Sequence, residues 1–390
     1  MTQTAPLADG IHALLPREKM NPLARRRRDA YAITPDAPLI RAEFGLMEGT
    51  LEEWRKQGMP TDVSQAELFS FDGSASHVCG GLGWCEGAFA PVFETKQIAD
   101  CGDTEIVQDW AGRHVLYFKG RRNGFVPEYV DHPVKDQRTW IEKVKWRLDP
   151  ATPVRWENLD RDMAAAKAAA AQGFMIVQSI VGGYMFLRSL WGPEELLYAF
   201  VDQPALIHDC MQTWLALAEA VTARHQQHIT LDEVFLAEDI CYNHGSLISP
   251  AMMQEFLFPY YQQLLTNIQR RQLDPHRRLY VQVDTDGDCR PVIPLYQKAI
   301  GLDAMTPFEV ASGCDVVEIG RQHPHLMMYG GIDKRILARS LAEIDRMVER
   351  ILPVLRRRGG YVPCCDHAVP SEVPYANYLH FRKRCVELGG

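Results

Sequence analysis

Five short apolar runs in this chain each end abruptly in polar or charged residues. The clearest is Leu279–Gly287, a β-rich run that closes on Asp284 and Asp286. Four further runs have the same form and end in Glu238 and Asp239, in Glu309, in Asp333, and in Cys364 to His367. Such runs are typical of buried parallel strands, and in α/β barrels the carboxyl ends of these strands carry the chemistry.

Helical patterns alternate with strand-like runs from about residue 158 onward. We predict helices over 159–171, 204–227, 250–264 and 340–358, the last opened by a Ser340/Glu343 capping box. Strands are expected near residues 175, 236, 281, 304, 328 and 362. This alternation predicts an α/β fold with a parallel sheet, and we interpret it as a (β/α)8 TIM barrel.

A closed barrel needs two more strands upstream of residue 158, and one is expected at Pro38–Phe44. An open doubly wound sheet is the alternative. The chain has no Gly-x-Gly-x-x-Gly or phosphate-loop motif, which argues against a nucleotide-binding version of that sheet.

Residues 65–134 show a different sequence pattern, in which β-forming residues alternate with turns that contain Gly and Asp. They predict β-hairpins, with Ala111–Arg113 as one turn. Because two or three paired strands cannot bury a core alone, we expect 65–134 to be a β-rich attachment packed on a single barrel domain, 38–390.

The N-terminal arm, residues 1–37, contains the basic run Arg25–Arg28, which we interpret as a solvated helix face or tail. A short helix is predicted over Thr50–Gly58, with Thr50 as its N-cap.

Composition excludes several classes of function. The 390 residues carry a net charge of −8, which disfavours nucleic acid as a partner. No apolar run approaches the ~20 residues of a membrane span, and Met1–Glu18 lacks the pattern of a secretory signal. The 10 cysteines show no disulfide framework, so a cytoplasmic location is expected.

The strand ends supply the candidate site. Glu238, Asp284 and His367 are predicted as catalytic residues, because carboxylates and an imidazole can shuttle a proton to a leaving oxygen. With Cys365 the same three residues could ligate a divalent metal such as zinc.

Other polar residues near the predicted barrel mouth are candidates for binding the substrate, namely Tyr184, Asn243 and Asp333. Each strand-end carboxylate also has a structural alternative. Asp284 and Asp286 could cap a helix near Pro291–Lys298, and Asp333 could cap or stabilise a turn.

The cysteines are expected to be mostly structural. Cys364 and Cys365 are adjacent, so at most one can face the barrel mouth. Cys289 and Cys314 follow strand ends without histidine neighbours, which favours structural roles.

Several segments resemble the uroporphyrinogen decarboxylase superfamily, and more closely its branch of corrinoid-linked methyltransferases. They are Arg41–Gly45, Thr50–Pro60, Pro127–Val134, Glu238–Pro250, Pro307–Val317, Gly330–Lys334 and Gly360–Pro370. The resemblance covers most of the chain from about residue 40. It implies a single (β/α)8 barrel with its site at the carboxyl ends of the strands.

Two motifs of that superfamily are replaced in this chain. The arginine-rich Met-Arg-Gln-Ala-Gly-Arg signature of uroporphyrinogen decarboxylases is not found. Where zinc-dependent thiol methyltransferases carry His-x-Cys, this chain has Asp284-x-Asp286, and its own His77-Val78-Cys79 lies far upstream.

The resemblance implies a methyltransferase. A methyl group would pass from a small methylated donor, such as an aryl methyl ether, to a corrinoid carried by a partner protein, with zinc as the candidate metal. Dimeric members of the superfamily imply a homodimer.

Two other functions remain open from the sequence. A decarboxylase of a non-porphyrin or porphyrinogen-like acid would need a cation for the carboxylate, from Arg188, Arg290 or Lys334. A non-catalytic, ligand-binding barrel is the third possibility.

Overall fold

The computed structural model describes residues 19–120 and 128–390, so the predictions for Met1–Glu18 and Pro127 fall outside the described residues. Seven strands form one parallel sheet in the order β1-β6-β7-β10-β11-β12-β13. Their bounds are β1 Ser76–Cys79, β6 Met175–Val181, β7 Glu233–Ala237, β10 Tyr280–Asp284, β11 Ala304–Thr306, β12 Met327–Tyr329 and β13 Tyr361–Val362. The structure therefore confirms all six predicted downstream strands and the parallel α/β class.

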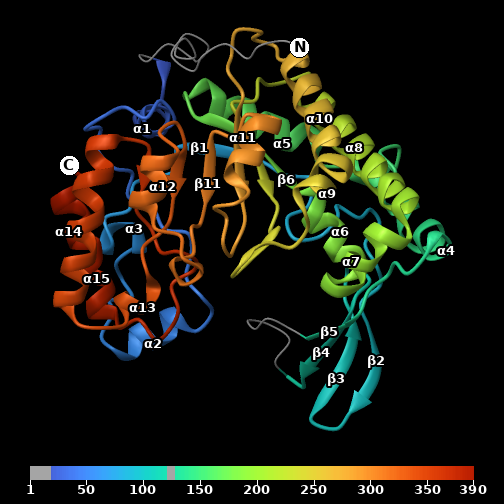
Figure 1. The fold of residues 1–390 in the computed structure, drawn as a ribbon, viewed down its shortest axis with the longest axis horizontal. Coiled ribbons are helices and arrows are strands. Elements are labelled where there is room, and N and C mark those ends of the chain that lie inside the picture. Colours follow the sequence, from blue (N-terminus) through green and yellow to red (C-terminus); the bar gives the residue numbers. More distant parts are fainter. Residues whose placement is uncertain (1–18, 121–127) are drawn as a thin grey trace.

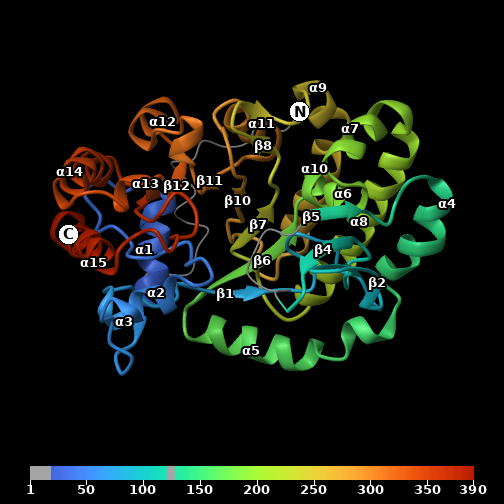
Figure 2. The same cartoon turned by 90° about the horizontal axis from the view of Figure 1, so that it is seen from below.

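Helices follow the strands and cover the outer face of the sheet, which is curled (Figure 2). They are α5 Leu159–Ala171, α6 Gly183–Trp191, α7 Pro193–Asp202, α8 Pro204–His225, α9 Pro250–Phe256, α10 Phe258–Arg271, α11 Ile293–Ile300, α12 Val316–Gln322, α13 Lys334–Leu337, α14 Leu341–Arg358 and α15 Tyr375–Gly389. The Ser340/Glu343 capping box opens α14 as predicted. Within the described residues, no helix is long and apolar enough to cross a membrane.

Residues 41–47 lie against both edges of the parallel sheet. The backbone N–H of Arg41 donates to the carboxylate of Asp72, shortly before β1. Leu46 forms an isolated parallel bridge with Val369, beyond β13. The strand predicted at Pro38–Phe44 is absent, because its partners are not strands: Leu39 donates to the carbonyl of Gly389 on α15, and Arg41 bonds to the backbone and side chain of Asp72.

Helix α1, Pro22–Tyr31, packs against the amino-terminal end of the inner face of the sheet. Arg27 lies 2.8 Å from a carboxylate oxygen of Glu233, and Tyr31 stacks on Tyr280 with ring centroids 4.0 Å apart. The prediction that Arg25–Arg28 form a solvated face is therefore wrong for Arg27, because Arg27 forms an ion pair with the buried Glu233 on β7.

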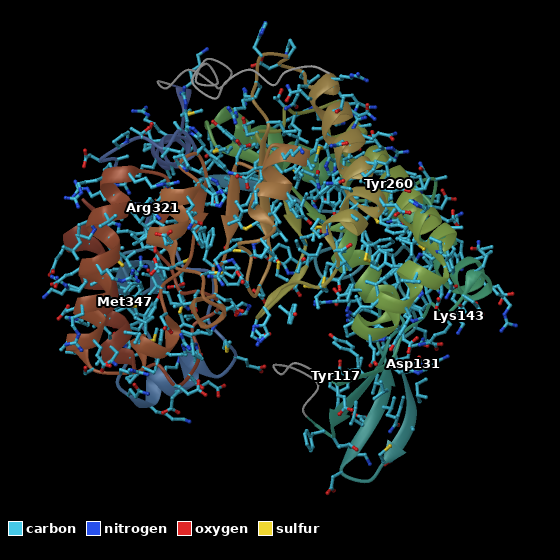
Figure 3. The ribbon with its side chains drawn as sticks, viewed as in Figure 1. Tyr117, Asp131, Lys143, Tyr260, Arg321 and Met347 are labelled. Carbon is cyan, nitrogen blue, oxygen red and sulfur yellow. The ribbon has the colours of Figure 1, made fainter. Side chains whose placement is uncertain are left out.

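Four antiparallel strands form a second sheet, β2 Lys96–Cys101, β3 Thr104–Gln108, β4 His114–Phe118 and β5 Glu128–Asp131. The predicted turn at Ala111–Arg113 joins β3 to β4. This sheet projects beyond α6 and α7 (Figure 1), and Figure 3 shows Tyr117 and Asp131 out on it. Residues 76–79 belong instead to the main sheet as β1, because they pair in parallel register with β6.

The short helices α2 Thr50–Lys56 and α3 Gln65–Leu68 lie on the side of the C-terminal helix α15, whereas α4 Gln137–Thr139 lies on the opposite side of the molecule near α8 (Figure 1). The prediction that Thr50 caps α2 is wrong. Gly49 is the N-cap, and the buried Thr50 hydroxyl donates to the carbonyl of Val369. A tertiary hydrogen bond thus replaces the local cap.

Candidate active site at the carboxyl ends of the strands

Asp284 lies at the end of β10 and faces the inside of the curled sheet. Its register partners are Ala237 on β7 and Thr306 on β11, so the three residues share one face. That face is the inner one, because Gln282, two residues earlier, accepts a hydrogen bond from Arg27 of α1.

Unsatisfied polar atoms gather at this edge of the inner face. The Oδ1 atom of Asp284 and the Oγ1 atom of Thr306 are buried without a hydrogen-bond partner among the described residues. Burial, with the nearby charges of Asp286 and Asp239, raises the pKa of the Asp284 carboxyl well above its ordinary value. The protonated form of Asp284 is therefore favoured far more than in an ordinary aspartate.

Asp286 and His367 form the solvent-facing rim of the same region. The Nε2 atom of His367 lies 3.6 Å from a carboxylate oxygen of Asp286, and about a third of each side chain is exposed. Burial and the charges of Asp239 and Glu309 raise the pKa of Asp286 to about 7. Burial and Lys334 lower the pKa of His367. Asp286 can therefore exchange protons near neutral pH, and the neutral form of His367 is favoured beside it.

A lysine on α13 connects two further acids of this rim. The Nζ atom of Lys334 lies 3.5 Å from Glu309 and 3.5 Å from Asp366. Asp366 is fully buried, and its carboxylate accepts the backbone N–H groups of Val310 and Lys334. Glu309 accepts the backbone N–H of Gly287. These bonds fix the loops that follow β10, β11 and β12 relative to one another.

An ion pair forms the opposite side of the site. Asp239 adopts a positive φ of 42°, which is uncommon for a residue other than glycine, and its carboxylate binds the guanidinium of Arg188 on α6. The hydroxyl of Tyr184, one turn earlier on α6, is buried without a hydrogen-bond partner among the described residues. Asp239 and Arg188 influence the pKa of Tyr184, so the three groups are neighbours.

Glu238 lies on the other face of the sheet. It follows Ala237 by one residue, and its carboxylate accepts hydrogen bonds from Tyr261 of α10, at 2.7 Å, and Tyr296 of α11, at 2.9 Å. Burial raises its pKa to about 7, although both tyrosine hydroxyls oppose this rise. Of the three predicted catalytic residues, Asp284 and His367 therefore lie toward the mouth and Glu238 lies among the helices.

We expect Glu238→Gln to change stability rather than turnover. Because the folded pKa of about 7 exceeds the ordinary 4.5, the unfolded chain loses its proton first and stability falls as pH rises from 4.5 to about 7. At about 1.4 kcal/mol per pKa unit, this loss of stability amounts to about 3 kcal/mol. The variant should not show this loss, because glutamine does not titrate.

Thermal melts of wild type and Glu238→Gln across pH 4.5 to 8 measure this effect. The wild type should lose stability as the pH rises toward 7, whereas Glu238→Gln should not show this loss, so the variant should gain on the wild type toward neutral pH. A pH-independent difference, combined with a large loss of turnover, would instead assign Glu238 to the chemistry.

The remaining predicted residues differ in what surrounds them. Asp333 accepts the backbone N–H of Arg335 and pairs with its guanidinium, so its capping alternative is confirmed. Asn243 is exposed in the turn between two short strands, β8 Cys241–Tyr242 and β9 Gly245–Ser246. The capping alternative for Asp284 and Asp286 is wrong, because α11 begins after Val292 without a side-chain cap.

The predicted metal ligands do not form a cluster. Both oxygens of Glu238 are occupied by tyrosine hydroxyls. Cys365 is fully buried, and burial raises the pKa of its thiol well above the ordinary value. Among the described residues, no group of three or more His, Cys, Asp or Glu side chains could hold a metal ion. The donor set therefore does not fit zinc.

The cysteines behave largely as predicted. Cys364 and Cys365 are both fully buried. Cys289 and Cys314 are buried against each other, with sulfur atoms 3.7 Å apart.

Sequence reasoning missed two residues of the inner face. Thr306 ends β11, whereas the sequence pattern placed the polar end of that run three residues later, at Glu309. Trp84, in the loop after β1, stacks on Phe235 of β7 with ring centroids 5.3 Å apart. No local pattern marks Trp84, because β1 is too short and polar to be recognised as a strand.

A curled parallel sheet with acids gathered at its carboxyl ends is the arrangement used by enzymes of the α/β-barrel class. A family model described as uroporphyrinogen decarboxylase (URO-D) matches residues 165–388. The chain therefore belongs to the uroporphyrinogen decarboxylase family. Among curated proteins, none matches the chain in sequence.

Solved structures are similar to this chain at low sequence identity. A methyltransferase from Methanosarcina mazei matches with a TM-score of 0.58 and 11% identity, over 94% of this chain and 98% of that chain. A putative vitamin-B12 independent methionine synthase from Listeria monocytogenes matches with a TM-score of 0.33 and 13% identity, over 59% of this chain and 68% of that one. At 11% identity, the first likeness concerns the fold alone.

Proposed function

We propose that the protein transfers a methyl group from a small methylated donor, such as an aryl methyl ether, to a corrinoid carried by a partner protein. The observation that carries this proposal is Asp284 on the inner face of the sheet, whose pKa is raised well above its ordinary value and whose buried Oδ1 atom has no hydrogen-bond partner among the described residues. Membership of the uroporphyrinogen decarboxylase family and the fold of the Methanosarcina mazei methyltransferase support the reaction class.

Methyl transfer from oxygen needs a proton for the leaving group. As the methyl–oxygen bond breaks, its electron pair stays on the oxygen, and an unassisted alkoxide or phenoxide leaves poorly. Burial and the acidic neighbours Asp286 and Asp239 raise the pKa of Asp284 well above its ordinary value, which favours the protonated acid that this step requires. It would give this proton to the leaving oxygen and become a carboxylate.

The rim can return the proton to Asp284. Asp286, with a pKa of about 7, raises the pKa of Asp284 through its charge and contacts His367 at 3.6 Å. About a third of the His367 side chain is exposed, so it can take protons from water. A proton passed from His367 to Asp286 and then to Asp284 would therefore restore the protonated form of Asp284 after each turnover.

A reduced corrinoid, when bound, would supply the nucleophile that accepts the methyl group. The inner face offers apolar surface that fits a flat macrocycle: Trp84 is 49% exposed while stacked on Phe235, and Val78 of β1 is 57% exposed. Aromatic surface exposed in this way is typical of binding sites.

We further infer that residues 41–46 complete the barrel as its eighth position, between β13 and β1. Their contacts with Asp72 and Val369 at the two sheet edges support this closure. In the same proposal the four-stranded sheet is an attachment of a single barrel domain, and two copies form a dimer.

The alternative function is a decarboxylase, which requires a cation for the substrate carboxylate. The three candidate cations are already paired: Arg188 with Asp239, Arg290 with Asp288, and Lys334 with Glu309 and Asp366. Lys334 is the best placed of them, because its two contacts are long, at 3.5 Å.

The proposed function is tested by anaerobic incubation of the protein with reduced cobalamin and a panel of methylated donors. We expect one class of donor, with a methylated oxygen or nitrogen, to lose its methyl group while the cobalamin becomes methylated. If no donor reacts while a carboxylic acid of matched shape releases carbon dioxide, the decarboxylase is the correct function.

A further inference from the structure

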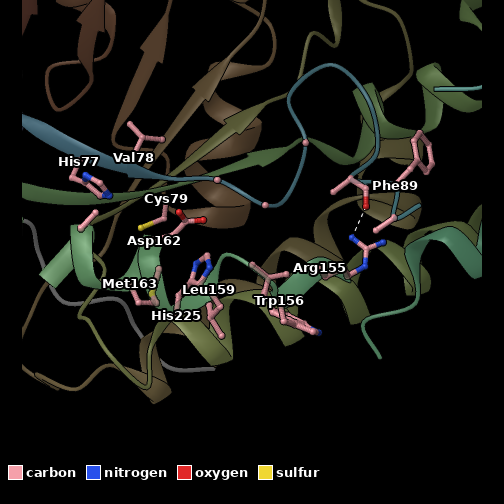
Figure 4. A pocket seen from close by; sticks show the side chains of 17 residues that line it. His77, Val78, Cys79, Phe89, Arg155, Trp156, Leu159, Asp162, Met163 and His225 are labelled. Carbon is pink, nitrogen blue, oxygen red and sulfur yellow. Dashed lines mark hydrogen bonds between the residues drawn. The ribbon is translucent and has the colours of Figure 1, made fainter. Parts of the chain in front are cut away.

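A second cavity, of about 540 Å³, lies on the helix side of β1 (Figure 4). Its walls come from β1 and the loop after it, from the turn Pro153–Trp156, and from α5 and α8. His77 and Cys79 line it, while the Val78 side chain points to the opposite face of β1. The sheet therefore separates this cavity from Asp284. Its volume falls within the range of small-molecule sites, about 300–1,000 Å³.

One end of the cavity accepts hydrogen bonds. The side-chain amide of Gln178 donates to the carbonyls of Cys79, Gly80 and Ser179, which fixes its oxygen toward His225. The Nδ1 atom of His225 lies 2.7 Å from that oxygen and must carry the proton. Burial lowers the pKa of His225 to about 4, so its Nε2 atom is an acceptor at neutral pH. The carboxylate of Asp162 lies close to both His225 and Cys79.

The other end of the cavity carries a cation, Arg155. The guanidinium of Arg155 donates to three main-chain carbonyls, those of Ala88, Arg147 and Asp149. Burial lowers its pKa to about 10, and the charge of Asp149 opposes this fall only in part. A guanidinium has five N–H groups, so two remain to bind an anion.

Apolar side chains separate the two ends, chiefly Leu159, Met163 and Val221. We propose that this cavity binds a small organic carboxylate, with its acid group at Arg155 and a hydroxyl or amino donor at its far end facing Asp162 and His225. Arg161 pairs with Asp162 at 3.0 Å, but the uncharged acceptor nitrogen of His225 beside it offers no donor to a carboxylate, which disfavours the reverse orientation. This site is additional to the methyl-transfer site and does not depend on that function.

Substitutions at Gly80 test this proposal directly. A Cβ atom at Gly80 would meet no atom within 4 Å, and its φ is not in the left-handed region. Gly80→Phe should therefore fill the cavity without straining the backbone, and Gly80→Ala is the matched control that leaves most of the volume open. Asp162→Asn, compared with Asp160→Asn on the same helix but outside the cavity lining, tests the acceptor end.

Isothermal titration calorimetry on the full chain, with 4-hydroxybenzoate and 6-hydroxyhexanoate as probes, measures binding directly. At least one acid should bind the wild type, and Gly80→Phe should weaken it by at least about tenfold, whereas Gly80→Ala and Asp160→Asn should change it by less than about threefold. Removing the hydroxyl (benzoate or hexanoate) or the carboxylate (4-hydroxybenzyl alcohol or 1,6-hexanediol) should each weaken binding by about tenfold or more.

Two results would overturn this assignment. One is equal binding to wild type and a folded Gly80→Phe, which would put the ligand elsewhere. The other is no binding of either acid to the wild type at about 10 mM, a concentration that would reveal even millimolar affinity. Should Gly80→Phe fail to fold, the Asp162→Asn and Asp160→Asn pair decides the question, since equal weakening by both would contradict it. Because the readout is binding, failure here is distinguishable from failure of methyl transfer.

Discussion

Asp284→Asn should reduce turnover by about 10²–10⁴-fold while leaving the fold intact. The amide has the shape of the acid but no proton to give to a leaving oxygen. In the wild type, activity should fall on the alkaline side, as Asp284 loses its proton. An aspartate with an ordinary pKa of 3.8 would already have lost it at neutral pH.

The same substitution should raise stability. Because the folded pKa of Asp284 lies well above 3.8, the unfolded chain releases its proton first, and folding loses stability as pH rises through that interval. Asparagine does not titrate, so the variant should melt at the same or a higher temperature than wild type at pH 7. Lost activity with retained or increased stability is the pattern expected of an active-site acid.

Asp333→Asn is the matched control for Asp284→Asn. The carboxylate of Asp333 caps α13 and pairs with Arg335, so this change should cost about 1 kcal/mol of stability and leave turnover within a few fold. If both variants lose turnover equally, or if Asp284→Asn keeps it, the assignment of the acid to Asp284 is wrong.

The positions of Asp284 and Glu238 show what the sequence could predict. Both follow apolar runs, and both were expected at the carboxyl ends of parallel strands, where the structure has them. Side chains alternate between the two faces of a strand, so an uncertainty of one residue at its end reverses the predicted face. For this reason the sequence located the edge of the sheet but not the side on which Glu238 lies.

Tertiary contacts determine the remaining differences between sequence and structure. The sequence predicts Arg27 as part of a solvated basic run. In the structure it binds Glu233, over two hundred residues later, on the inner face of the sheet. β1 has the sequence Ser-His-Val-Cys, which shows no strand pattern, and it is a strand because β6 pairs with it. Local patterns cannot report partners that are distant in the sequence.

Gly182 marks the closest approach between the loops after β6 and β7. A Cβ atom there would lie 1.8 Å from an Oε atom of Glu238, 2.7 Å from its Cα and 2.8 Å from the carbonyl oxygen of Ala237. The carboxylate could rotate away only by leaving the hydroxyls of Tyr261 and Tyr296. The two backbone atoms cannot move without opening the sheet edge that carries Asp284.

We therefore expect Gly182→Ala to destabilise the protein by at least about 3 kcal/mol, at or beyond the usual cost of overpacking a core. With about 2.1 cal/mol/K of unfolding entropy per residue, this lowers the melting temperature by roughly 4 °C or more. Gly80→Ala is the control, because its Cβ atom meets nothing within 4 Å, and it should change stability by no more than about 0.5 kcal/mol. Thermal melting of the two variants beside wild type measures both effects. Equal melting temperatures for both variants would show that β6 and β7 separate readily, and the fixed geometry assigned here to Glu238 and Asp284 would then be wrong.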